Sequence, residues 1–170
     1  MSRLIICLMI AGTLVSFGCG KKKSTEEKIA EKQIEAATGG DADVDISEKG
    51  AKMTLTTDEG TMKVSTGEQA SIPKDFPEDI PIYKGAEVQT SLQIPGGFSI
   101  VMFSKDNVKT VASALKSDIA DNGWESMSAM EMGPQTILSF KKGDRVLSVV
   151  VAKNEDDGNT MISINTHKGE

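Results

Sequence analysis

Short segments in which apolar and polar residues alternate, separated by glycine-containing turns, fill most of the chain after residue 43. Such alternation places every second side chain on one face of a β-strand. Three early segments repeat every nine residues and read apolar, polar, apolar: Val44-Asp45-Ile46, Met53-Thr54-Leu55 and Met62-Lys63-Val64. They predict a three-stranded β-meander over residues 44–71. Its apolar face needs a cover, for which we expect a preceding helix or the C-terminal domain.

Residues 87–170 predict an α+β domain with the element order ββαββββ. Turn-forming residues such as Pro95-Gly96-Gly97 and Lys142-Gly143 separate the segments. The expected strands are 87–94, 98–103, 125–132, 135–141, 145–152 and 160–167. One helix packed across an antiparallel sheet would bury the apolar faces of both.

The single expected helix of this domain spans about 107–122, and Asp106 or Asn107 is its expected start. Gly123 ends it, which would let Trp124 fold back onto Ile119. The only tryptophan is therefore interpreted as a core residue. The apolar face of the helix comprises Val108, Val111, Ala112, Leu115 and Ile119.

A proline-rich connector, residues 72–86, joins the two parts. Prolines at 73, 77 and 81 exclude a regular helix and favour an extended, stiff segment. We expect its apolar residues to pack on the domain; they are Phe76, Ile80, Ile82 and Tyr83. The alternative is a proline-rich ligand for an SH3-like partner.

The N-terminus has the parts of an export signal over residues 1–18. Arg3 precedes an uncharged, mostly apolar run from Leu4 to Phe17, which is too short for a regular membrane-spanning helix. Cys19 would be the only cysteine left after cleavage, since Cys7 lies within the signal. Because a single cysteine forms no internal disulfide, we expect Cys19 to carry a lipid. The alternative is ordinary cleavage of a secreted chain.

Residues 19–43 then form the expected lipid-anchored tether. Lys21, Lys22 and Lys23 would support membrane attachment beside anionic headgroups. A short helix is expected at 24–37, where Ser24 and Glu27 have the spacing of a capping box. Its thin apolar stripe predicts a spacer near the membrane.

Ser16-Phe17-Gly18-Cys19, the TGGDADVDI run and the FPEDIPIYKGA segment before an α+β domain together resemble a family of uncharacterised bacterial lipoproteins. Ser16 stands where leucine is usual, and Lys84 where proline is commoner. The resemblance implies acylation of Cys19 and no particular activity. Gly20, where many lipoproteins of the inner membrane have aspartate, implies the outer membrane rather than the inner one.

Residue types used in catalysis are scarce. His167, near the C-terminus, is the only histidine, so neither a serine triad nor a zinc site is indicated. Asp41, Asp43 and Asp45 fail the EF-hand pattern, since Ile46 and Lys52 occupy its glycine and glutamate places. Solvent-facing strand residues are the simpler interpretation of these aspartates.

Met127, Met130 and Met132 form the one tempting metal motif, because thioethers suit Cu(I). On a strand, however, Met127 would point away from the other two, and methionine commonly fills apolar cores. We therefore assign no metal and no cofactor, and keep these three methionines as candidate copper ligands only.

The chain carries a formal charge of −6, which disfavours nucleic acid as a partner. These observations predict a non-enzymatic envelope lipoprotein that binds a protein or another envelope component. If so, its domain should present a surface apolar patch or an open sheet edge. The alternatives are a periplasmic small-molecule or Cu(I) carrier, and a carboxylate-dependent hydrolase.

Overall fold

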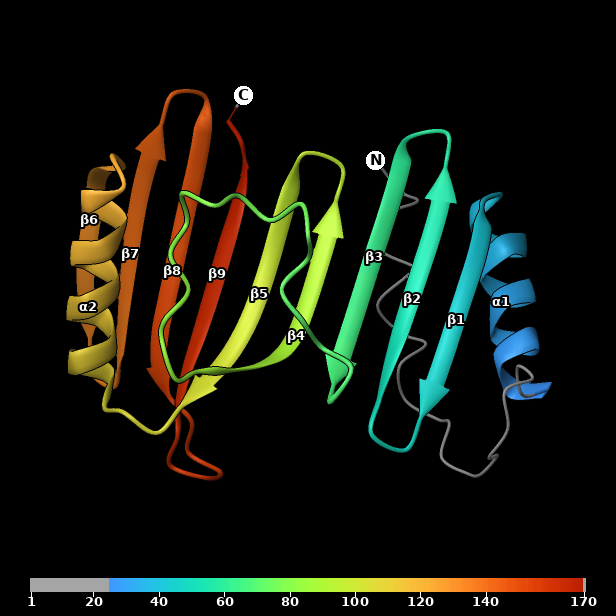
Figure 1. The fold of residues 1–170 in the computed structure, drawn as a ribbon, viewed down its shortest axis with the longest axis horizontal. Helices are drawn as coiled ribbons and strands as arrows, with labels where there is room; N and C mark the ends of the chain where they lie inside the picture. Colours follow the sequence, from blue (N-terminus) through green and yellow to red (C-terminus); the bar gives the residue numbers. More distant parts are fainter. Residues whose placement is uncertain (1–24, 170) are drawn as a thin grey trace.

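The computed structural model describes residues 25–169, in which nine strands form one antiparallel sheet (Figure 1). Their order across the sheet is β1-β2-β3-β4-β5-β9-β8-β7-β6. The N-terminal strands are β1 (Asp41–Ser47), β2 (Gly50–Thr57) and β3 (Gly60–Gly67). The others are β4 (Glu87–Ile94), β5 (Gly97–Ser104), β6 (Glu125–Met132), β7 (Gln135–Lys142), β8 (Arg145–Lys153) and β9 (Thr160–Lys168). The predicted α+β class and the ββαββββ order are confirmed.

The meander and the C-terminal domain share this sheet, although the sequence suggested two separate ones. β3 pairs with β4 over four positions, from Lys63 opposite Gln93 to Thr66 opposite Thr90. Strands pair through backbone hydrogen bonds, which do not depend on side-chain identity. The apolar–polar alternation of each strand therefore does not predict that β3 pairs with β4. The pairing makes one face of β2, β3 and β4 continuous with the core face of the domain.

The main core lies between helix α2 (Val108–Asp121) and strands β7 and β8. Asn107 caps the helix by accepting a hydrogen bond from the backbone N–H of Thr110, at 2.9 Å. At the other end Gly123 has φ +81°, and the Trp124 N–H donates to the Ile119 carbonyl at 3.3 Å. Trp124 is 3% exposed, which confirms its predicted place in the core.

The proline-rich connector crosses the same face of the sheet as α2 (Figure 1). Two successive turns shape it: the Phe76 N–H donates to the Pro73 carbonyl, and the Ile80 N–H to the Pro77 carbonyl. The segment is therefore a chain of turns and not the fully extended strap that the prolines suggested. Because Phe76 and Ile80 are four residues apart, they take equivalent places in the two turns, and both are buried in the core. Ile82 and Tyr83 pack against this core, as predicted.

Helix α1 (Thr25–Thr38) packs beside β1, at one edge of the sheet (Figure 1). Three glutamates spaced one helical turn apart accept hydrogen bonds from backbone N–H groups of this edge strand. The pairs are Glu27 with Ile46 at 2.9 Å, Glu31 with Val44 at 2.9 Å, and Glu35 with Ala42 at 3.4 Å. The segment that the sequence suggested as a spacer is thus the cover of a sheet edge.

Candidate functional site

Strand β6 forms the opposite edge of the sheet, and all eight of its residues are exposed. It pairs on one side with β7, with a bulge between Ser126 and Ser128. An edge strand of this length offers unpaired N–H and carbonyl groups to an incoming strand. It is an open sheet edge, one of the two surface features that the sequence led us to expect.

The three candidate copper ligands all lie on this edge strand. Met127 is 59% exposed, Met130 49% and Met132 56%. Met130 and Met132 share one face, since Met130 is opposite Ile137 and Met132 opposite Gln135. Met127 lies at the bulge. The three side chains therefore make an adaptable apolar rim on the edge strand.

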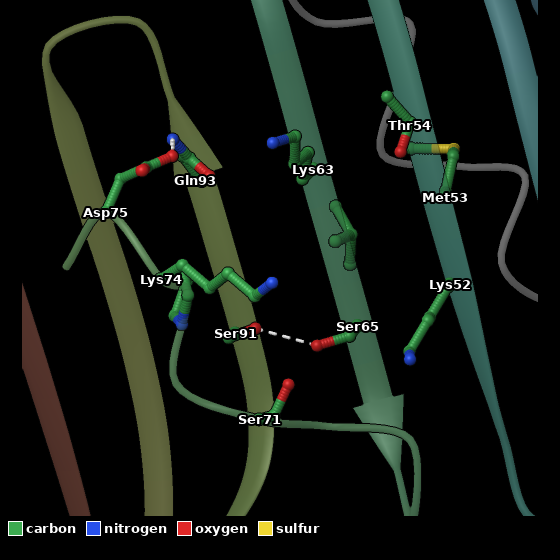
Figure 2. A pocket seen from close by; sticks show the side chains of 12 residues that line it. Lys52, Met53, Thr54, Lys63, Ser65, Ser71, Lys74, Asp75, Ser91 and Gln93 are labelled. Carbon is green, nitrogen blue, oxygen red and sulfur yellow. Dashed lines mark hydrogen bonds between the residues drawn. The ribbon is translucent and has the colours of Figure 1, made fainter.

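A groove lined by both polar and apolar side chains lies further along the sheet, between strands β2 to β4 and the start of the connector (Figure 2). Its volume is about 280 Å³. We call it the lysine groove, after the residues that distinguish it: Lys52, Lys63, Lys74, Ser65, Ser91 and Asp75. The rest of its lining comprises the polar residues Thr54, Ser71 and Gln93 and the apolar residues Met53, Val64 and Pro73.

On the floor of the lysine groove, the hydroxyl oxygens of Ser65 and Ser91 are 2.7 Å apart and hydrogen-bonded. Both serines are buried. At the rim, Gln93 donates to the Asp75 carboxylate at 3.4 Å. Asp75 is the one carboxylate of the lining, so the groove does not provide the pair of acids that a glycosidase-type hydrolase needs.

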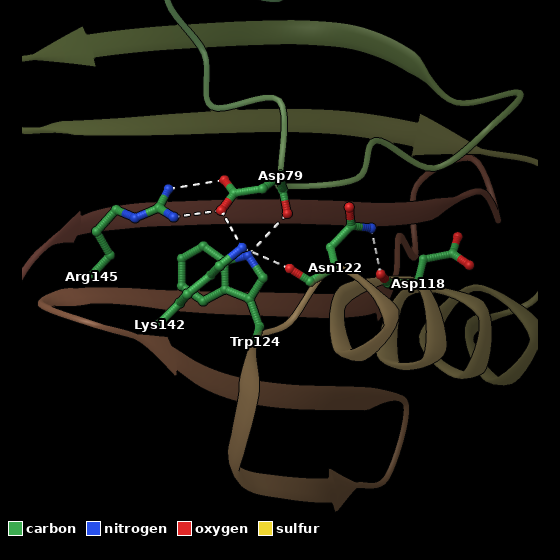
Figure 3. A network of polar contacts seen from close by, with 6 residues as sticks. All are labelled: Asp79, Asp118, Asn122, Trp124, Lys142 and Arg145. Atoms are coloured by element: carbon green, nitrogen blue, oxygen red, sulfur yellow. Dashed lines mark hydrogen bonds and ion pairs between the residues drawn. The ribbon is translucent and has the colours of Figure 1, made fainter.

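A compact ionic cluster fixes the connector to the domain (Figure 3). The Asp79 carboxylate accepts hydrogen bonds from the Arg145 guanidinium and, at 2.8 Å, from the Lys142 ammonium. Trp124 Nε1 donates to the Asp79 carbonyl at 2.9 Å, and the Arg145 guanidinium lies 4.8 Å from the centre of the Trp124 ring. These contacts join Asp79 of the connector to Trp124, Lys142 and Arg145 of the domain, and together they hold the connector in place.

Hydrogen bonds from Arg145, together with one from Lys142, lower the pKa of Asp79 from 3.8 to about 2, and partial burial opposes this shift only in part. The hydrogen bonds between Arg145 and Asp79 also raise the pKa of Arg145. The cluster therefore stays fully ionised at neutral pH. Because Arg145 and Lys142 both bind the Asp79 carboxylate, the cluster acts as a structural clamp and its one acid is already engaged.

The remaining predicted site residues are dispersed or outside the structure. Cys19 and Lys21 to Lys23 lie outside the described residues. His167 is exposed near the end of β9, and Asp41, Asp43 and Asp45 are exposed along β1. Within residues 25–169, no three His, Cys, Asp or Glu side chains are placed to hold a metal. No helix in this range is long and apolar enough to cross a membrane.

The interior between α2 and the sheet is filled by side chains. Val111, Leu115 and Ile119 on the helix are fully buried, as are Phe140 and Leu147 on the facing strands. A small-molecule carrier would be expected to have its pocket there. The lysine groove lies elsewhere, on the polar part of the same sheet face.

Residues 86–160 match the model of a START domain-like family. The matched segment runs from the end of the connector through β4, β5, α2 and β6 to β8, and ends at the first residue of β9. It thus contains the open edge strand β6 but leaves most of the lysine groove outside. No curated protein and no solved structure matches the chain significantly. The family match is compatible with a ligand-binding role.

Sequence reasoning did not foresee the lysine groove. A signal was present, because Lys52 and Thr54 on β2, and Lys63 and Ser65 on β3, occupy the polar alternate positions of their strands. From the sequence, only Asp43 and Asp45 on that face are interpreted, as residues that face solvent. Only the pairing of β3 with β4 and the course of the connector enclose the groove.

Proposed function

We propose that the protein is a non-enzymatic, lipid-anchored protein of the bacterial cell envelope, whose β6 edge binds an extended segment of a partner protein. The observation that carries this proposal is the contrast between the two edges of the sheet. Glutamate side chains of α1 accept hydrogen bonds from backbone N–H groups of β1, whereas β6 is exposed along its whole length. An exposed edge strand is the surface to which partner peptides add by strand pairing.

The side chains of β6 indicate which residue types the partner segment should contain. Met127, Met130 and Met132 suit apolar side chains of varied shape, because the thioether chain is flexible and polarisable. Glu131 lies near one end of the strand and favours a basic residue in the segment there, whereas Glu125 at the other end already forms a salt bridge with Lys141. A second copy of this acidic chain, with a formal charge of −6, is a less suitable partner.

The sequence supports the anchored location. An export signal precedes Cys19, and three lysines follow Gly20 before α1 begins at Thr25. Lipidation of Cys19 would hold the sheet close to a membrane, with the outer membrane favoured by Gly20. The similarity of residues 86–160 to a START domain-like family supports a binding role, and the scarcity of catalytic residue types supports a non-enzymatic one.

The test uses the mature lipidated protein in nanodiscs and an array of extended ten-residue peptides from exported proteins of the source organism. Peptides that bind are expected to slow hydrogen exchange at the amides of β6. Met130→Lys should weaken their binding about tenfold or more, since lysine on an edge strand disfavours added strands. The control is Ile29→Lys, a like change at a side chain of α1 that is 51% exposed against 49% for Met130. Protection elsewhere, or equal effects of both variants, would refute the proposal.

A further inference from the structure

We propose that the lysine groove is a binding site for a small molecule that carries phosphate groups. It is separate from the β6 edge, so this inference does not depend on the partner protein proposed above. The groove draws residues from β2, β3, β4 and the connector, and only Ser91 and Gln93 lie within the START domain-like segment.

The charge of the groove is the first argument. Lys52, Lys63 and Lys74 converge on it from β2, β3 and the connector, within a chain whose formal charge is −6. Figure 2 shows Lys74 extending across the groove towards β3. Among the described residues, no carboxylate forms a salt bridge with any of these three lysines. Their charge is therefore available to a ligand.

A protective role does not account for these lysines. Lysine often guards an edge strand against unwanted pairing. β2 and β3, however, are interior strands with a neighbour on each side. Asp43 and Asp45 lie on the same face one strand further out, opposite Thr54 and Lys52. They border the groove on the side away from the connector and limit where an anion fits.

The floor of the groove supplies neutral donors. Ser65 and Ser91 use one hydrogen bond between their hydroxyl groups, so the hydroxyl that accepts it keeps its own proton for a further bond. Ser71 and Thr54 add two further hydroxyl groups, and the apolar residues Met53, Val64 and Pro73 line the rest of the groove. Asp75 is engaged by Gln93 at the rim.

This combination favours phosphate over carboxylate. A flat carboxylate is best matched by the fork of an arginine, whereas lysine binds phosphate as a point charge and hydroxyl groups add directional bonds. The lining residues contain no arginine. A volume of about 280 Å³ lies just below the usual range of small-molecule sites and fits one compact molecule. Free phosphorylated solutes and lipid headgroups share this chemistry.

Calorimetry with the full mature protein in nanodiscs of neutral lipid tests the site, with inorganic pyrophosphate as the soluble probe. In a second arm, phosphatidylglycerol replaces part of the neutral lipid, and amide shifts of the groove residues are followed by NMR. Binding of pyrophosphate alone would assign a soluble ligand. Groove shifts with phosphatidylglycerol would assign a lipid headgroup. Either result supports the site only if it is lost in the variant below.

The decisive variant is Lys52→Gln, Lys63→Gln and Lys74→Gln combined. Its matched control removes the same charge from three exposed lysines outside the groove, as Lys109→Gln, Lys116→Gln and Lys153→Gln. We expect the groove variant to weaken binding about tenfold or more and the control to change it less than about twofold. Melting temperatures should agree within about 2 °C. No binding in either arm, or equal losses in both variants, would overturn the proposal.

Discussion

Glu31 on helix α1 accepts a hydrogen bond from the backbone N–H of Val44 on β1, at 2.9 Å. Glu27 and Glu35, one turn before and after, do the same for neighbouring N–H groups of the strand. A row of carboxylates thus binds the backbone N–H groups of β1 that could otherwise pair with another strand. Charge-assisted bonds of this kind are stronger than neutral ones.

Replacing all three glutamates with alanine should expose the β1 edge. We expect the triple variant to self-associate at concentrations at which the native protein does not, because the freed N–H groups can pair with another chain. Light scattering after size-exclusion chromatography measures this. The control replaces three exposed glutamates that lie on neither α1 nor β1, Glu59, Glu87 and Glu155, with alanine. Equal self-association of the two variants would point to net charge as its cause.

Asp79→Asn should destabilise the fold by about 1–3 kcal/mol, because it leaves Arg145 and Lys142 without the carboxylate that they share. Urea unfolding, followed by the fluorescence of Trp124, measures the loss. Asp58→Asn, at an exposed turn residue, is the control and should change stability by less than about 0.5 kcal/mol. Equal stability of the two variants would show that the clamp contributes nothing.

The clamp also predicts a pH dependence. The pKa of Asp79 falls from 3.8 to about 2 on folding, so its ionised form stabilises the native state at neutral pH. That contribution, roughly 2 kcal/mol, should be lost as the pH falls from about 4 to about 2. Urea titrations across this range should show a shallower loss for Asp79→Asn than for the native chain. Parallel curves would contradict the assignment.

Leu115→Ala should cost about 2–5 kcal/mol, since Leu115 is fully buried between α2 and the sheet. The adjacent Lys116→Ala is exposed and is expected to stay within about 0.5 kcal/mol of the native stability. Urea midpoints of the two variants give the comparison. A loss below about 1 kcal/mol at Leu115 would mean that the helix is loosely packed.

The mass of the mature protein tests the anchor. In membrane fractions of expressing cells we expect a chain that begins at Cys19 and carries added acyl mass, and Cys19→Ala should abolish both features. An unmodified soluble chain would indicate ordinary secretion. In that case the binding surfaces described above would operate without attachment to a membrane.

The local elements followed closely from the sequence. Helix α2 was expected at about 107–122 and spans Val108–Asp121, with its cap at Asn107 and its end at Gly123. The strands of the domain were placed almost to the residue. Apolar periodicity, caps and glycine turns act over a few neighbouring residues, and these signals are strong here.

The candidate sites were harder to predict. The methionines of β6 were identified from the sequence, but that β6 lies at an open edge depends on where the chain goes after α2. The lysine groove depends on Lys52, Lys63 and Lys74, which are distant in sequence and carry no motif. Nothing in the sequence around Asp79 indicated the clamp, because its partners Lys142 and Arg145 lie far along the chain, at the end of β7 and the start of β8.

The sequence by itself determined which segments become strands and helices, and which of their faces are apolar, because those properties depend on periodicity within each segment. Only the tertiary structure decided that β3 pairs with β4, that α1 covers β1 and that β6 remains open. Backbone N–H and carbonyl groups are the same in every strand, so the sequence does not specify by local pattern which edges meet. The groove and the open edge are consequences of that long-range pairing.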